Sequence, residues 1–94
     1  MRPIFSLAMT AEFFATLRAD GRSDITTVDV IEHFFGPYVV DTGVHVSRSP
    51  NGRFGLALSR HAHELGIELL REHVPYTDGQ GNETTTAQWR LIRP

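Results

Sequence analysis

The most informative part of this 94-residue chain is Asn51-Gly-Arg-Phe-Gly-Leu-Ala-Leu-Ser-Arg-His-Ala-His-Glu-Leu-Gly66. Phe54, Leu58, Ala62 and Leu65 recur at the spacing that brings side chains onto one face of an α-helix. The pattern runs without a turn signal until Gly66, a residue suited to the left-handed position after a helix. We therefore predict one amphipathic helix over residues 51–65.

A β-hairpin is the alternative for this region. Tyr38–Ser47 contains β-branched residues, and Pro50-Asn-Gly52 could turn the chain so that Arg53–Leu58 returns as a strand. That hairpin would leave Arg60–Glu64 without any periodic pattern, so we favour the helix.

The residues after this helix predict a second, more regular hairpin. Glu72–Tyr76 and Thr84–Ile92 are strand-like, and the polar, Gly-containing segment Thr77–Glu83 separates them. On the last strand Ala87, Trp89 and Leu91 alternate with polar residues, so they should pack inward over the helices. Trp89 is expected to stabilise the core.

Two helices are predicted before residue 38. Thr10 is the expected N-cap of a helix over Ala11–Arg18, which Asp20-Gly21 would end. Thr26 and Asp29 have the spacing of a capping box for the second helix, which carries the apolar residues Val28, Ile31, Phe34 and Phe35. Gly36-Pro37 should end this helix.

Three helices followed by a two-stranded wing give an α+β fold, the winged helix-turn-helix. We expect one such domain over residues 1–94. A third short strand is expected either from Ile4–Leu7 at the N-terminus or from residues 38–46.

Two segments also carry a family resemblance. Arg53-Phe-Gly-Leu-Ala-Leu-Ser59 and Thr84-Thr-Thr-Ala-Gln-Trp-Arg-Leu91 resemble the third helix and closing wing strand of small winged-helix domains of phages, prophages and other mobile elements. The resemblance covers about residues 10–93 as a pattern and about 45 residues closely. It implies DNA binding with the third helix in the major groove. The β-branched stretch 38–50 and the absence of Lys depart from the family pattern.

Composition places the chain among small cytoplasmic proteins. It lacks Cys, which excludes disulfides and thiolate metal sites, and no apolar run approaches the roughly 20 residues of a membrane span. The net charge of −2 is unlike the basic footprint usual for nucleic-acid binders. Its distribution is uneven, because residues 1–47 hold three Arg against six acids and residues 48–94 hold six Arg against five.

The polar side of the predicted third helix and the wing tip are the candidate DNA-binding surfaces. Arg side chains can contact guanine or phosphate, and wing hydroxyls and amides can contact phosphate or the minor groove. The candidate residues are Arg48, Asn51, Arg53, Ser59, Arg60, His63, Gln80, Asn82, Thr84 and Thr86. We expect a small regulator or accessory factor that binds double-stranded DNA, as a homodimer if it reads a palindrome.

Catalysis and metal binding have little support in the sequence. No nucleophile elbow, phosphate loop or zinc-protease motif is present, so we expect no enzyme and no cofactor. His61 and His63 are two residues apart, which on a helix separates them by about 200° and prevents both from reaching one ion.

A different class of function is also consistent with the first half of the chain. Its carboxylates could dock on a basic surface of a host protein, such as a nucleic-acid-handling or defence complex, as a phage-encoded inhibitor would. The residues for this alternative are Asp20, Asp24, Asp29, Glu32 and Asp41.

Overall fold

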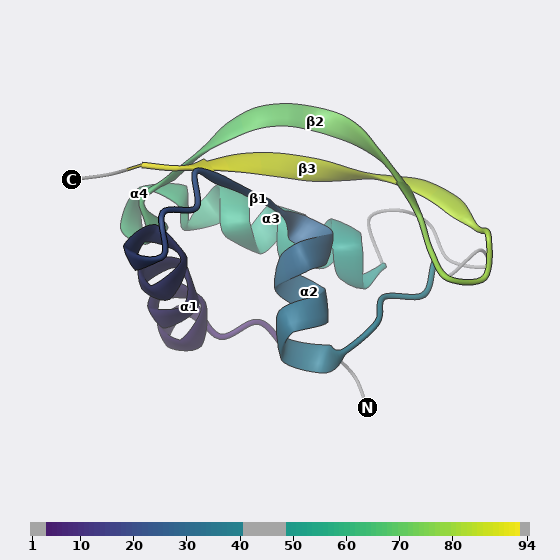
Figure 1. Ribbon diagram of the computed structural model, residues 1–94, viewed down its shortest axis with the longest axis horizontal. Helices are drawn as coiled ribbons and strands as arrows, with labels where there is room; N and C mark the ends of the chain where they lie inside the picture. The colour runs from purple at the N-terminus through teal and green to yellow at the C-terminus, as the bar shows by residue number, and fades with distance from the viewer. Residues whose placement is uncertain (1–3, 41–48, 93–94) are drawn as a thin grey trace.

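Four helices and three strands make up the part of the chain that the computed structural model describes, residues 4–40 and 49–92. Their order is α1 (Leu7–Ala19), β1 (Asp24–Thr26), α2 (Thr27–Phe35), α3 (Pro50–Arg60), α4 (Ala62–Leu65), β2 (Ile67–Thr77) and β3 (Glu83–Leu91). The fold is α+β, with the helices on one side of an antiparallel sheet (Figure 1). Within these ranges no helix is both long and apolar enough to cross a bilayer.

Helix α1 begins one turn earlier than the sequence predicts. Its N-cap is Ser6, whose hydroxyl accepts a hydrogen bond from the Met9 amide at 3.3 Å. The prediction of Thr10 as the cap was wrong, because Thr10 is helical and buried in the core. A hydroxyl residue fits either position, and only packing distinguishes the two.

Helix α2 begins and ends where the sequence predicts. The Thr26 hydroxyl accepts from the Asp29 amide, and the Asp29 carboxylate accepts from the Thr26 amide, each at 3.1 Å. This reciprocal pair is the predicted capping box. Gly36 ends the helix with a φ of 87°, a conformation that side chains with a Cβ rarely adopt.

The predicted third helix is present but interrupted. Ser49 caps α3 through its hydroxyl, which accepts from the Gly52 amide, and Pro50 occupies the first turn. The helix stops at Arg60, and the backbone of His61 separates it from the four-residue α4, so one continuous helix to Leu65 was wrong. Gly66 ends α4 in the left-handed conformation, as predicted. The hairpin alternative is also wrong, because Arg53–Leu58 is helical.

The sheet has the order β1-β3-β2. The predicted hairpin is present as β2 and β3, but β2 begins at Ile67 rather than Glu72. The third strand is not Ile4–Leu7: it is β1, whose Ile25 pairs with Trp89 of β3. Residues 38–40 form no strand, and residues 41–46 of the other expected strand lie outside the described part. β2 carries two register irregularities between Leu69 and Val74 and curves over the helices (Figure 1).

The core lies between the helices and the sheet. Trp89 and Leu91 are buried in it and Ala87 packs against it, which confirms the predicted inward alternation on the last strand. The Trp89 indole N–H donates to the Thr27 hydroxyl at 3.0 Å, so the polar edge of the ring is satisfied inside the core. This bond joins the first turn of α2 to β3.

Candidate nucleic-acid interface

Helix α3 presents one exposed face, which the geometry of its buried face determines. Phe54 and Leu58 are buried against the core, four residues apart on the same side of the helix. With about 100° between successive residues, the opposite arc carries Arg53, Leu56, Ser59 and Arg60. Ser59 and Arg60 are exposed and Arg53 is half-buried. The structure therefore brings together three of the candidate residues that the sequence predicted.

Arg53 and Arg60 are the only charged residues of α3, whose sequence contains no acid. In the described part of the chain neither guanidinium forms an ion pair, in contrast to Arg90, whose Nη1 lies 3.0 Å from Glu68 Oε1. The Arg53 Nε atom is buried and has no hydrogen-bond partner among the residues that the structure describes. Both positive charges of α3 are therefore left without a carboxylate partner there.

Leu56 was not among the residues that the sequence singled out. It is 61% exposed, although it belongs to a helix whose other large apolar residues, Phe54 and Leu58, are buried. Its exposure could have been predicted from the sequence, because Leu56 lies three residues after Arg53 and four before Arg60, near the centre of the polar arc. An exposed leucine between two arginines is the most distinctive feature of this face.

The two histidines after α3 have different environments. His61 is half-buried, stacks on Phe5 with ring centroids 6.0 Å apart, and its Nδ1 lies 3.3 Å from Glu64 Oε1. His63 is exposed in α4, beyond the break that ends α3. His61 therefore packs the N-terminal segment against the helix, whereas His63 lines a shallow hollow with Ala15 and Arg18 of α1.

Asn51 and Thr86 occupy the interior rather than the surface. They are 7% and 4% exposed. The Asn51 side chain donates to the Thr85 carbonyl at 2.7 Å and accepts from the Thr86 hydroxyl at 3.1 Å. The Thr86 hydroxyl also accepts from the Val28 amide. These bonds tie α2, α3 and β3 together, so both residues are placed where they fix the position of α3 and cannot reach a ligand.

The hairpin loop is organised around Asp78. One carboxylate oxygen accepts from the Gln80 and Asn82 amides at 2.9 Å, and the other accepts from the Val40 amide at 2.8 Å. The Val40 bond is the largest of several that hold the pKa of Asp78 below its usual value, against the opposing effect of burial. Asp78 therefore shapes the loop and attaches it to the segment after α2, a role that the sequence did not reveal.

The predicted loop residues have unequal access to a ligand. The Gln80 side chain is exposed, whereas the Asn82 amide group donates to Asp78 Oδ2 at 3.3 Å, and Thr84 is half-buried on β3. Arg48 lies outside the described residues. In Figure 1 the loop end of the β2–β3 hairpin extends beyond the helices.

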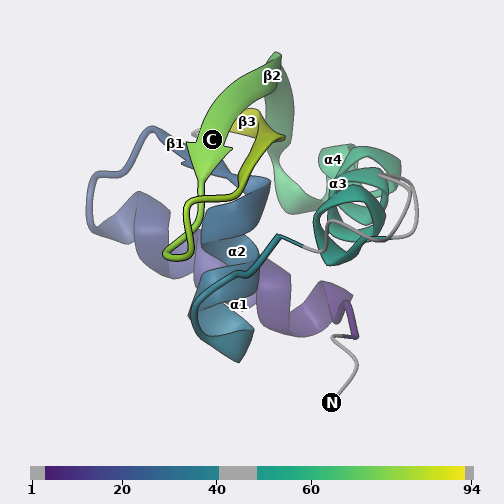
Figure 2. The same ribbon diagram turned by 90° about the vertical axis from the view of Figure 1, so that its right-hand side faces the viewer.

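The acidic residues considered for protein binding are partly engaged within the fold. Asp29 forms the capping box, and Glu32 accepts a hydrogen bond from the Tyr38 amide at 3.1 Å. Asp20 is exposed and Asp24 is half-buried, near the connection from α1 to β1. Asp41 lies outside the described residues. Figure 2 shows this connection on the opposite side of the molecule from α3.

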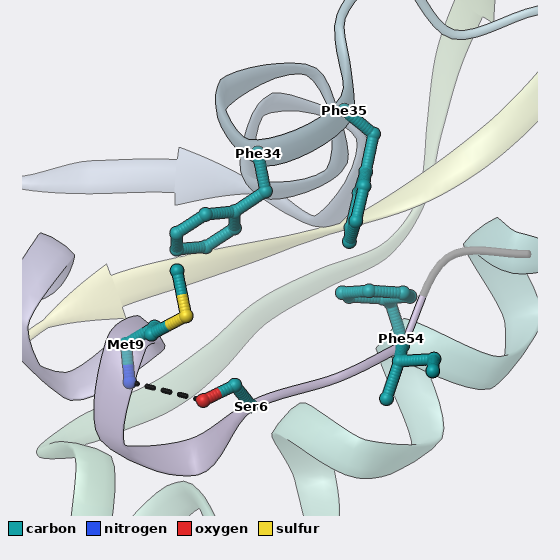
Figure 3. Close-up of a pocket in the computed structure, with 6 residues that line it drawn as sticks. Ser6, Met9, Phe34, Phe35 and Phe54 are labelled. Carbon is teal, nitrogen blue, oxygen red and sulfur yellow. Dashed lines mark hydrogen bonds between the residues drawn. The ribbon is translucent and has the colours of Figure 1, made fainter. Parts of the chain in front are cut away.

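One apolar pocket opens between the helices. Phe34 and Phe35 at the end of α2, Phe54 of α3, and Met9 and Ser6 around the start of α1 face it (Figure 3), together with Ile4. Its volume is about 120 Å³, well below the several hundred Å³ typical of small-molecule sites. The Phe35 and Phe54 rings meet edge to face at 5.8 Å. This pocket is therefore a small apolar hollow, partly open to solvent, beside the exposed side chains of Ile4, Met9 and Phe35.

Within residues 4–40 and 49–92, no three His, Asp or Glu side chains gather closely enough to hold a metal ion. Comparison with family models, with curated proteins and with solved structures gives no match for this chain.

Proposed function

We propose that this chain is a winged helix-turn-helix protein that binds double-stranded DNA, with α3 in the major groove and the β2–β3 hairpin as the wing. The helix and strand order, together with the sheet order β1-β3-β2, supports this fold. Its role is that of a small regulator or accessory factor. Because the net charge of the chain is −2, binding depends on local charge rather than on the charge of the whole molecule.

The exposed face of α3 carries the proposal. It presents Arg53 and Arg60, and α3 itself contains no acid to oppose a phosphate backbone. Eleven helical residues extend about 16 Å, and an α-helix fits the width of the major groove, about 12 Å. The buried hydrogen bonds of Asn51 to Thr85 and Thr86 fix this helix on the sheet, as a helix that recognises base edges requires.

Replacing Arg60 with Ala tests the proposal. The side chain is exposed, so the variant should fold normally, and we expect its affinity for duplex DNA to fall roughly tenfold as one forked contact is lost. Arg22→Ala is the matched control, because Arg22 is also exposed but lies in the α1–β1 connection, across the molecule from α3 (Figure 2). Its affinity should not change.

The measurement is fluorescence anisotropy with labelled random duplex DNA at low and moderate salt, alongside thermal melts of each variant. Equal affinities of the wild type and the Arg60→Ala variant would exclude Arg60 as a DNA contact. A wild-type protein that binds no duplex even at low salt would exclude DNA binding itself. The alternative would then be binding of a basic protein partner through acidic residues such as the exposed Asp20.

A further inference from the structure

Leu56 occupies the centre of the exposed arc of α3. With about 100° per residue, Arg53 and Arg60 lie within about 20° of one another, and Ser59 lies about 120° from Arg53 on the side towards Leu56. Leu56 falls about midway between these limits and is 61% exposed. A partner that covers this face therefore buries an apolar side chain between two arginine positions, one N-terminal and one C-terminal to it along the helix.

The charges around Leu56 indicate the chemistry of its partner. An exposed leucine alone would suit any apolar surface, but α3 carries two arginines and no acid, and neither arginine forms an ion pair with any residue in the described ranges 4–40 and 49–92. A polyanion with an apolar group at its surface matches this pattern. Among the base edges in the major groove, the C5-methyl of thymine is the apolar group, and guanine offers the paired acceptors that suit arginine.

We propose that Leu56 contacts a thymine methyl group in the major groove, next to guanines or phosphates that Arg53 and Arg60 contact. This inference rests on the proposed function and adds a sequence preference to it. The seven residue steps from Arg53 to Arg60 span about 10 Å along the helix, which corresponds to about three base-pair steps at 3.4 Å each. The thymine therefore lies within a few base pairs of both arginine contacts.

The test removes the methyl group and leaves the rest of the base unchanged. Duplexes are first selected from a random library by binding to the wild-type protein. Each thymine of the selected site is then replaced, one at a time, by deoxyuridine. Losing the burial of one methyl group should weaken wild-type binding roughly fourfold at one or two positions and leave the other positions unaffected.

The Leu56→Ala variant is then measured on the same thymine and deoxyuridine duplexes. Because Leu56 is exposed, this variant should fold, and it should bind thymine and deoxyuridine duplexes equally at the positions where the wild type discriminates. The Arg60→Ala variant is the matched control. It should bind both duplexes more weakly but retain the fourfold ratio between them.

The outcomes separate the two proposals. If selection yields duplexes but the wild type does not discriminate deoxyuridine at any position, the methyl contact is excluded and DNA binding stands. If Leu56→Ala discriminates as strongly as the wild type, the methyl contact belongs to another residue and the inference fails. If selection yields no duplex, the proposed function fails together with the inference.

Discussion

Trp89, the one tryptophan of the chain, contributes both a buried aromatic ring and a hydrogen bond to the core. It is 3% exposed, and its indole N–H donates to the Thr27 hydroxyl. We expect Trp89→Ala to lower the free energy of unfolding by about 3–5 kcal/mol, because a large cavity would remain. Trp89→Phe should cost less, since it keeps most of the ring and loses the hydrogen bond. Denaturant titrations would show this order, and an unchanged midpoint for the alanine variant would contradict it.

Asp78 makes stability depend on pH. Hydrogen bonds from backbone amides, that of Val40 foremost, lower the pKa of this carboxyl in the folded chain. The folded state therefore binds the proton less tightly than the unfolded state. The resulting stabilisation is present above the ordinary aspartate pKa of about 3.9 and is lost as the pH falls through the lower, folded-state pKa.

The Asp78→Asn variant should therefore melt at a lower temperature than the wild type near neutral pH, and the difference should shrink as the pH falls below about 4. Melting curves of both proteins between pH 7 and pH 3 measure this difference. A difference that stays constant over the whole range would mean that the charge of Asp78 does not hold the loop.

At the scale of elements, the turn that joins α4 to β2 depends on Gly66 and Arg18. Gly66 has a φ of 67°, and a Cβ there would lie 2.8 Å from Arg18 Nη2. The Arg18 guanidinium donates to the carbonyls of Leu65, Gly66 and Ile92, so it cannot move aside without breaking these bonds. The side chain thereby fastens α1 to the start of β2 and the end of β3.

Alanine substitutions at three glycines should separate the cost of a left-handed φ from the cost of displacing the Arg18 side chain. Gly79→Ala adds a Cβ in open space and should be nearly neutral. Gly81→Ala forces a left-handed φ on a residue with a Cβ and should cost about 1–2 kcal/mol. Gly66→Ala should cost more than Gly81→Ala, because it also displaces Arg18.

Making Gly66→Ala in a protein that already carries Arg18→Met isolates the cost of displacing the guanidinium. In it, Gly66→Ala should cost about as much as Gly81→Ala does in the wild type. Unfolding free energies of the four single variants and of the double variant decide this. Equal costs for Gly66→Ala with and without Arg18 would show that the guanidinium does not resist the new Cβ.

The elements that the sequence predicted correctly are those with local signals. The capping box of Thr26 and Asp29 and the glycine after Leu65 act within a few residues, and both are present. Strand β1 could not be predicted in the same way, because Asp24–Thr26 is too short to show alternation and is extended by pairing with β3. The interruption of the helix at His61 could not be predicted either, because no Gly or Pro lies next to it.

At the scale of the whole molecule, tertiary contacts decide which polar residues remain available to a partner. Arg60 and Gln80 are exposed, as a surface role requires. Asn51 and Thr86 have the same polar character in the sequence, yet they are buried and hydrogen-bonded to one another. Their interior position depends on α3 meeting β3, residues more than thirty positions apart, which no local pattern encodes.

The distribution of charge over the molecule sets the expected salt dependence of DNA binding. A net charge of −2 gives no general attraction to DNA, so counterion release should come from the few arginines that touch phosphate. The logarithm of the binding constant should fall with the logarithm of salt concentration by about 0.9 per phosphate neutralised.

If Arg53 and Arg60 are both phosphate contacts, replacing both with Ala should make that slope shallower by about 1.8. If they contact guanine edges instead, the double variant should lose affinity and sequence preference with a smaller change in slope. Arg22→Ala should change neither quantity, because the α1–β1 connection that contains Arg22 lies across the molecule from α3 (Figure 2). A double variant with unchanged affinity and unchanged slope would mean that the charges of α3 play no part in binding. The hairpin loop, where the exposed Gln80 offers hydrogen bonds but no charge, would then be the next part of the proposed interface to test by substitution.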